Sequence, residues 1–121
     1  MEREYKVEVK AVARYVPMSP RKVRLVVDLV RGMKADEALA VLKFVPKAAA
    51  KPVAKVIRSA IANAEANYGL SREDLYIAKI FADTGPTRRW RRFGARGRIK
   101  PILRRSSHIT VVLEERESAA S

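Results

Sequence analysis

The sequence predicts an α+β protein with three helices, three strands and a long protruding β-hairpin arm. Strand-like apolar patterns occur near the N-terminus, after residue 74 and after residue 106, and helical patterns fill residues 20–68. Between the last two strand patterns lies a basic segment that holds no acidic residue. Because 121 residues suit one modest core, we expect a single domain over residues 1–121.

The first strand is predicted in "EYKVEVKA", residues 4–11. Its apolar side chains fall on one face and its charged side chains on the other, which is the period of a half-buried strand. The apolar face consists of Tyr5, Val7, Val9 and Ala11.

The first helix is predicted from Pro20, with Ser19 as the N-cap and Gly32 as the stop. Its apolar residues recur at helical spacing and predict a buried stripe. The stripe consists of Val23, Val26, Val27 and Val30, widened by Leu25 and Leu29.

Two further helices are predicted before residue 70. "ADEALAVLKFV" forms the shorter one and Pro46 ends it, with Ala38, Leu42 and Val45 on one face and Leu39 and Val41 nearby. The longer one covers about residues 47–68 and closes at Gly69; its start stays open, because Pro52 fits only within a first turn. Its buried stripe is Val53, Val56, Ile57, Ala60, Ile61 and Ala64.

The last two strands are predicted at residues 75–83 and 107–115, and the basic segment between them is predicted to form the arm. Gly94 and Gly97 lie near its midpoint and suit a turn. An arm of roughly nine residues a side would reach about 30 Å at ~3.3 Å per residue. We therefore divide the chain into a body (residues 1–84 and 106–115), an arm (85–105) and a frayed tail (116–121).

Positive charge is concentrated in that arm. The formal net charge is +13, and nine of the eighteen residues from 88 to 105 are Arg or Lys. Without these nine the chain has 17 basic and 13 acidic residues, so the rest is nearly balanced. A solvated basic surface is the simpler interpretation, but so much like charge favours a polyanionic partner over a small acidic ligand.

The composition argues against several other classes of protein. There is no cysteine, so disulfides and thiolate metal sites are excluded. No apolar run approaches the roughly 20 residues of a membrane span, and the charged N-terminus does not suit a secretory signal, so a cytoplasmic location is expected. The lone His108 suits a structural role or an RNA contact, and the pairs Asp36–Glu37 and Glu73–Asp74 suit capping. We expect no enzyme activity, metal, cofactor or small-molecule substrate.

The arm has the residue types of a nucleic-acid-binding segment. Arginine binds phosphates through planar, bidentate contacts. Trp90 and Phe93 either stack on unpaired bases or cover the backbone of the ribbon itself. Folded RNA suits this mixture better than duplex DNA does. The alternatives are a DNA-binding architectural protein, a small RNA-modifying or nucleolytic enzyme, and a membrane-binding arm, which lacks an amphipathic helix.

Five segments in order resemble the bacterial large-subunit ribosomal protein twenty-two family. They are "ARYVPMSPRKVRLVVDLVRG" at 13–32, "SAIANAEAN" at 59–67, "GP" at 85–86, "ARGR" at 95–98 and "SHITVVL" at 107–113. The resemblance spans about residues 5–115. One departure stands at the arm tip, where Phe93-Gly94 replaces the Pro-Arg that is common in the family.

The resemblance implies three helices packed on a three-stranded antiparallel sheet, with a hairpin that reaches the peptide exit tunnel of the cytoplasmic ribosome, or of a plastid ribosome. The implied partners are large-subunit ribosomal RNA, neighbouring proteins including ribosomal protein four, and the nascent peptide. The predicted RNA-binding residues are Arg14, Arg21, Lys22, Arg24, Arg88, Arg89, Trp90, Arg91, Arg92, Phe93, Arg96, Arg98, Lys100, Arg104 and Arg105. The predicted tunnel-tip residues are Arg92, Phe93, Gly94, Ala95 and Arg96.

Overall fold

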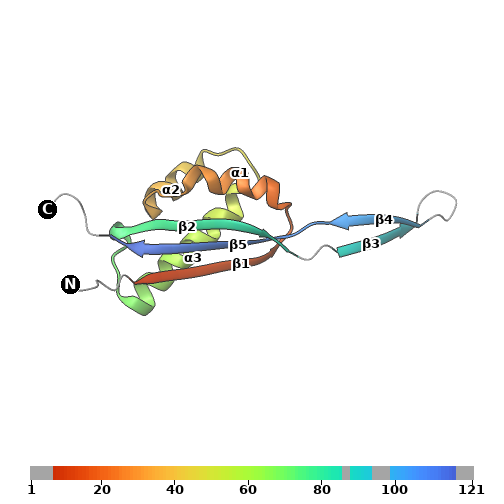
Figure 1. Ribbon diagram of the computed structural model, residues 1–121. Helices are drawn as coiled ribbons and strands as arrows, with labels where there is room; N and C mark the ends of the chain where they lie inside the picture. The colour runs from red at the N-terminus through yellow and green to blue at the C-terminus, as the bar shows by residue number, and fades with distance from the viewer. Residues whose placement is uncertain (1–6, 86–87, 94–98, 117–121) are drawn as a thin grey trace.

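A three-stranded antiparallel sheet forms the centre of the body (Figure 1). The computed structural model describes residues 7–85, 88–93 and 99–116. For the two arm strands it describes the backbone pairing. Strands β1 (Glu8–Val16), β5 (Ser107–Glu115) and β2 (Leu75–Thr84) lie in the order β1-β5-β2. The last strand in the sequence is thus the central one, and it pairs with both others along its whole length.

In the part of the chain that the structure describes, three α-helices cover one face of this sheet (Figure 1). They are α1 (Pro20–Val30), α2 (Ala35–Lys43) and α3 (Ala50–Tyr68), and a short 3₁₀ helix, Arg72–Asp74, precedes β2. Helix α3 packs against β1 and β5, and α1 packs against β2. The predicted α+β fold, with three helices on a three-stranded antiparallel sheet, is confirmed.

The helix boundaries follow the predicted signals closely. Ser19 is the N-cap of α1 and Pro20 is its first residue. Gly69 ends α3 in the left-handed conformation at φ 63°, where a side chain would be strained. Helix α3 begins at Ala50 rather than near residue 47, which places Pro52 in the first turn, where no backbone N–H bond is lost.

The core is formed where the helix stripes meet the inward face of the sheet. All six residues of the predicted α3 stripe are buried, and so are the four valines of α1. On the strands, the buried side chains include Val9, Ile77, Ile109, Val111 and Leu113. A continuous apolar layer between helices and sheet therefore holds the body together.

Four apolar residues that were predicted to face the core are exposed. Leu25 and Leu29 lie about 150° and 110° from the centre of the valine stripe of α1 at ~100° per residue, so they point away from the sheet. Val41 is exposed on α2, and the exposed Val7 precedes the first paired residue of β1, Glu8. The predicted faces were too wide, because α1 and α2 have the sheet and α3 on one side only.

The arm is an antiparallel ribbon that projects from one end of the body (Figure 1). Its strands are β3 (Arg88–Phe93) and β4 (Ile99–Arg104), paired from Arg88 opposite Arg104 to Phe93 opposite Ile99. The six described pairs give a ribbon of about 20 Å at ~3.3 Å per residue, and the other residues of the predicted nine a side lie outside the described part of the chain. The predicted turn at Gly94 and Gly97 lies outside the described residues.

The joint between body and arm is closely packed. The backbone N–H of Gly85 donates to the carbonyl of Ser106 at 2.9 Å, and Gly85 is buried. A Cβ at position 85 would stand 3.2 Å from the carbonyl carbon of Ser106 and closer still to its hydroxyl. A side chain at this position would therefore force Ser106 to shift, since β2 and β5 approach each other just before the arm begins.

Candidate RNA interface

The two ends of the sheet carry opposite charge, and the end away from the arm is the acidic one. There Glu8 and Glu114 are paired residues of β1 and β5, and the backbone of Arg116 donates to the carbonyl of Asp74 at 2.9 Å. Helix α2 starts at this end too, since Lys34 bridges to Tyr76. We call this the acidic end; its acids are Glu8, Asp36, Glu37, Glu65, Glu73, Asp74, Glu114 and Glu115.

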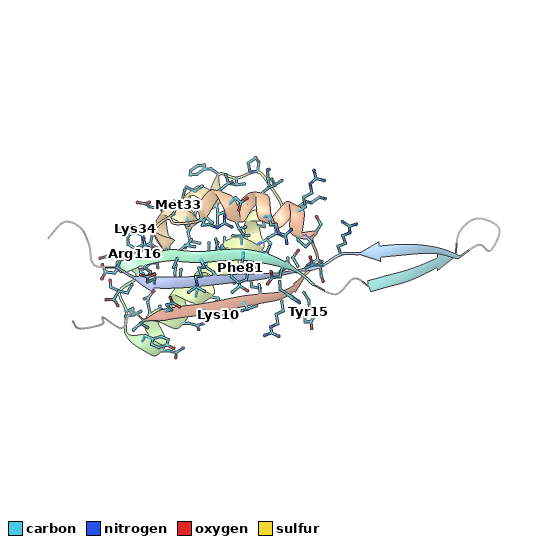
Figure 2. All side chains as sticks on the ribbon, viewed as in Figure 1. Lys10, Tyr15, Met33, Lys34, Phe81 and Arg116 are labelled. Atoms are coloured by element: carbon cyan, nitrogen blue, oxygen red, sulfur yellow. The ribbon has the colours of Figure 1, made fainter. Side chains whose placement is uncertain are left out.

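Basic residues at the acidic end have partners within the body. Arg72 donates to one carboxylate oxygen of Asp36 from both Nε, at 2.9 Å, and Nη2, at 2.6 Å. Hydrogen bonding to Asp36 and the negative charge of its carboxylate raise the pKa of Arg72 above its ordinary value. Lys34 and Arg116 lie over the ring of Tyr76, and Figure 2 shows both at the end opposite the arm. These cations are therefore committed to internal contacts.

The opposite end, where the arm begins, carries exposed cations. We call it the arm end; it includes the end of β1, the start of α1, and the residues that flank the arm. In the part of the chain that the structure describes, none of its basic residues forms an ion pair. The exposed basic residues here include Arg14, Arg21, Lys22, Arg24, Lys47, Lys55 and Arg105. One exposed acid, Asp83, also lies at this end, opposite His108.

Five of the predicted RNA-binding residues therefore lie together at the arm end. Arg14 is exposed on β1, Arg21 and Lys22 on the first turn of α1, and Arg105 beside the joint. Arg24 is also exposed, but its Nε donates to the carbonyl of Ala82 on β2 at 3.2 Å, so it fastens α1 to the sheet as well. Residues that are distant in the sequence thus present their charge on one side of the molecule.

The remaining candidates belong to the arm. Arg88, Arg89, Trp90, Arg91, Arg92 and Phe93 follow one another along β3, and Lys100 and Arg104 belong to β4. Gly94, Ala95, Arg96 and Arg98 lie outside the described residues. The backbone pairing places Trp90 opposite Ile102 and Arg92 opposite Lys100. Two pairs of basic residues, Arg88 with Arg104 and Arg92 with Lys100, therefore stand directly opposite each other in the ribbon, where like charges repel.

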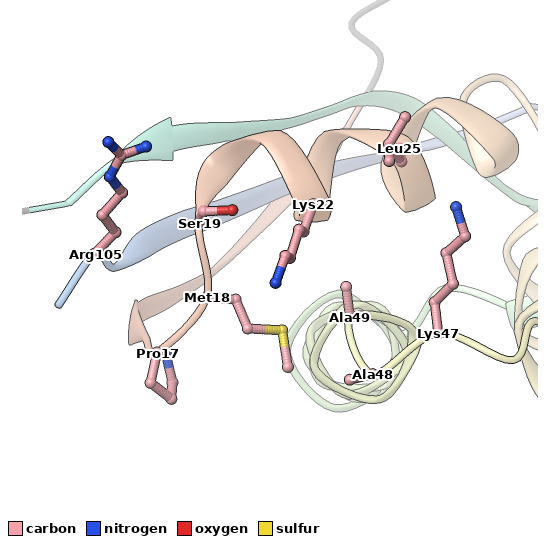
Figure 3. Close-up of a pocket in the computed structure, with 9 residues that line it drawn as sticks. All are labelled: Pro17, Met18, Ser19, Lys22, Leu25, Lys47, Ala48, Ala49 and Arg105. Carbon is pink, nitrogen blue, oxygen red and sulfur yellow. The ribbon is translucent and has the colours of Figure 1, made fainter.

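Sequence reasoning missed Lys47. It follows Pro46 in the connection between α2 and α3 and lines the same pocket as Lys22 and Arg105 (Figure 3). A single lysine in a connecting segment carries no pattern that a sequence could reveal. Only the packing of α3 against α1 brings it to the arm end.

His108 has a structural partner. Its Nδ1 accepts a hydrogen bond from the backbone N–H of Tyr15 at 3.1 Å, and the two rings meet edge to face with centroids 5.0 Å apart. Tyr15 has a positive φ of 58°, at the irregularity in the pairing of β1 with β5. The imidazole therefore satisfies a backbone group that the irregular register leaves out of the sheet.

The described residues hold no arrangement typical of a metal site or a membrane span. No group of three His, Cys, Asp or Glu side chains among them could hold a metal ion. In the same residues no helix is long and apolar enough to cross a bilayer. What the body presents instead is one cationic end, with a polycationic ribbon beyond it.

These features define a class: a small basic α+β protein that extends a β-hairpin arm from a cationic end. The family of ribosomal proteins described as "Ribosomal protein L22p/L17e" matches residues 11–114. The chain belongs to this family.

Curated relatives cover nearly the whole chain. The large ribosomal subunit protein uL22 of Thermoanaerobacter sp. (strain X514) is 54% identical over 91% of this chain and 99% of its own length. The corresponding protein of Finegoldia magna is 52% identical over 91% of this chain and 98% of its own. That of Carboxydothermus hydrogenoformans is 50% identical over 91% of this chain and 97% of its own length. The resemblance stated from five short segments is thereby confirmed.

Proposed function

We propose that this chain is a non-enzymatic constituent of the large ribosomal subunit in the cytoplasm, where it binds large-subunit ribosomal RNA and supports assembly. The observation that carries the proposal is the separation of charge: unpaired cations gather at the arm end, and the arm that leaves this end continues the same charge. Phosphates that surround the arm would neutralise it and allow RNA helices to pack around it.

The names of the relatives support the ribosomal part of the proposal. They are called large ribosomal subunit proteins, and they match this chain along nearly its full length. The family resemblance extends the proposal to the arm tip, residues 92–96, which would line the peptide exit tunnel near ribosomal protein four and meet the nascent peptide in passing.

The salt dependence of RNA binding tests the proposal. If the arm and the arm end neutralise about six to nine phosphates, the affinity for a large-subunit ribosomal RNA transcript should fall about 10³-fold or more between 50 and 200 mM salt. The charge reversal Arg96→Glu, in the arm, should weaken binding clearly. Lys34→Glu, at the acidic end, is the matched control and should leave the dissociation constant almost unchanged.

A filter-binding titration measures both variants at several salt concentrations. Equal losses for Arg96→Glu and Lys34→Glu would show that binding follows net charge rather than the arm. Absence of binding by the unaltered chain at low salt would contradict the proposed function itself.

A further inference from the structure

A pocket at the arm end has walls of two kinds. Its volume is about 780 Å³, and it lies between the start of α1, the connection before α3, and the residue that follows the arm. Figure 3 shows Lys22, Lys47 and Arg105 around it, one from each of these three segments. The other lining residues are Pro17, Met18, Ser19, Leu25, Ala48 and Ala49, so no acidic side chain lines the pocket.

The three cations at the rim are free to bind an anion. All three are exposed, and within the described residues none is in an ion pair. Helices α1 and α3 both begin beside the pocket, and neither has an acidic residue in its first turn or a side-chain capping bond. The helix dipoles therefore add partial positive charge to that of the side chains.

The pocket also has an apolar lining, its floor, which the binding of a phosphate alone would not require. Leu25 is 54% exposed at the pocket and Met18 is half-buried there. A volume of about 780 Å³ lies in the range of sites for ligands of nucleotide size, roughly 300 to 1,000 Å³. Ser19 also lines the pocket, and its hydroxyl makes no capping bond to α1.

We infer that this pocket binds one unpaired nucleotide of the RNA, with its base on the apolar floor and its phosphates at the cationic rim. The inference rests on the proposed function, because the ligand is part of the same RNA. The floor offers aliphatic contacts and one hydroxyl group, so it accepts the face of a base without selecting which base it is. An anchored nucleotide here would fix the body against the RNA at the point where the arm enters it.

The test compares two leucines of α1. Leu25→Ala removes part of the floor, whereas Leu29→Ala removes a similarly exposed leucine one turn further on and outside the pocket. Neither residue belongs to the core, so both variants should fold, which thermal melting checks. Leu25→Ala should raise the dissociation constant for a large-subunit ribosomal RNA transcript roughly fivefold, with its salt dependence unchanged. Leu29→Ala should have no effect.

The rim is tested through Lys47, the residue that the sequence did not point to. Lys47→Ala should lower the slope of log affinity against log salt by about one, because one phosphate contact is lost. The matched control is Lys43→Ala, at the end of α2, because this lysine does not line the pocket at the arm end and shares another pocket with Asp36 and Glu65. That variant should keep the slope of the unaltered chain.

The outcomes separate the inference from the proposed function. Suppose that Leu25→Ala and Leu29→Ala bind the transcript equally well while Lys47→Ala lowers the salt slope. The pocket then binds only a phosphate, and the inference that it holds a whole nucleotide is wrong. If Lys47→Ala and Lys43→Ala bind alike, the pocket is not part of the interface. If the unaltered chain does not bind the transcript at all, the proposed function fails together with the inference.

Discussion

Ser107 shows how one hydroxyl group holds the arm end together. Its side chain is fully buried, and its Oγ donates to the carbonyl of Met18 at 2.6 Å. Met18 lies in the segment that connects β1 to α1, so this bond ties the start of β5 to that connection. Met18 is half-buried, and its carbonyl loses this short bond if the hydroxyl is removed, because no other side chain of the described residues donates to it.

The prediction at this scale concerns Ser107→Ala. We expect the free energy of unfolding to fall by about 1–3 kcal/mol, because the carbonyl of Met18 loses its donor. Urea denaturation followed by circular dichroism measures this. Ser59→Ala, on the exposed face of α3, is the control and should change stability by less than about 0.5 kcal/mol. A Ser107→Ala protein as stable as the control would mean that the buried bond contributes nothing.

The arm, as an element, depends little on the core of the body. Strands β3 and β4 form a sheet of their own, separate from the sheet of β1, β5 and β2. A two-stranded ribbon alone is marginally stable in water. We therefore expect the body to keep its apolar layer without the arm, and the arm to need a partner surface to stay ordered.

Shortening the arm tests this independence. Residues 86–104 can be replaced by Asn-Gly, which leaves a three-residue loop between Gly85 and Ser106, a length that hairpins commonly use. We expect one cooperative thermal transition and a free energy of unfolding within about 1 kcal/mol of the full chain, since no side chain of the described core is removed. A broad, non-cooperative transition would show that the body needs the arm to fold.

At the scale of the whole molecule, the two ends of the protein differ in charge. Eight acids gather at the acidic end, and the unpaired cations and the arm lie at the other. Inside an RNA particle, phosphates attract the arm end and repel the acidic end. The molecule should therefore sit with its arm inward and its acidic end outward.

This orientation can be tested in translating ribosomes with a photoreactive amino acid. Placed at Ala95, near the predicted tip, it should crosslink to the nascent peptide if the arm tip lines the exit tunnel as proposed. Placed at Glu73, exposed at the acidic end, it should not. Crosslinking from Glu73, or none from Ala95 in particles that contain the protein, would contradict the proposed orientation. Gel analysis of a radiolabelled nascent chain gives the result.

The sequence alone determined the three helices, the last two strands of the body, the arm and its charge, because these depend on local periodicity and on residues that follow one another. Each of these signals is local in the sequence. Examples are the valine stripe of α1, the glycine at the end of α3 and the acid-free segment. The first strand was predicted at residues 4–11 but runs over Glu8–Val16, since its pairing with β5 rather than its own pattern sets its ends. Only the tertiary structure decided which end of the body is cationic. Lys22, Lys47 and Arg105 come from three separate segments and share a pocket only because α1, α3 and the joint pack together, and the exposure of Leu25 likewise follows from which side of α1 meets the sheet.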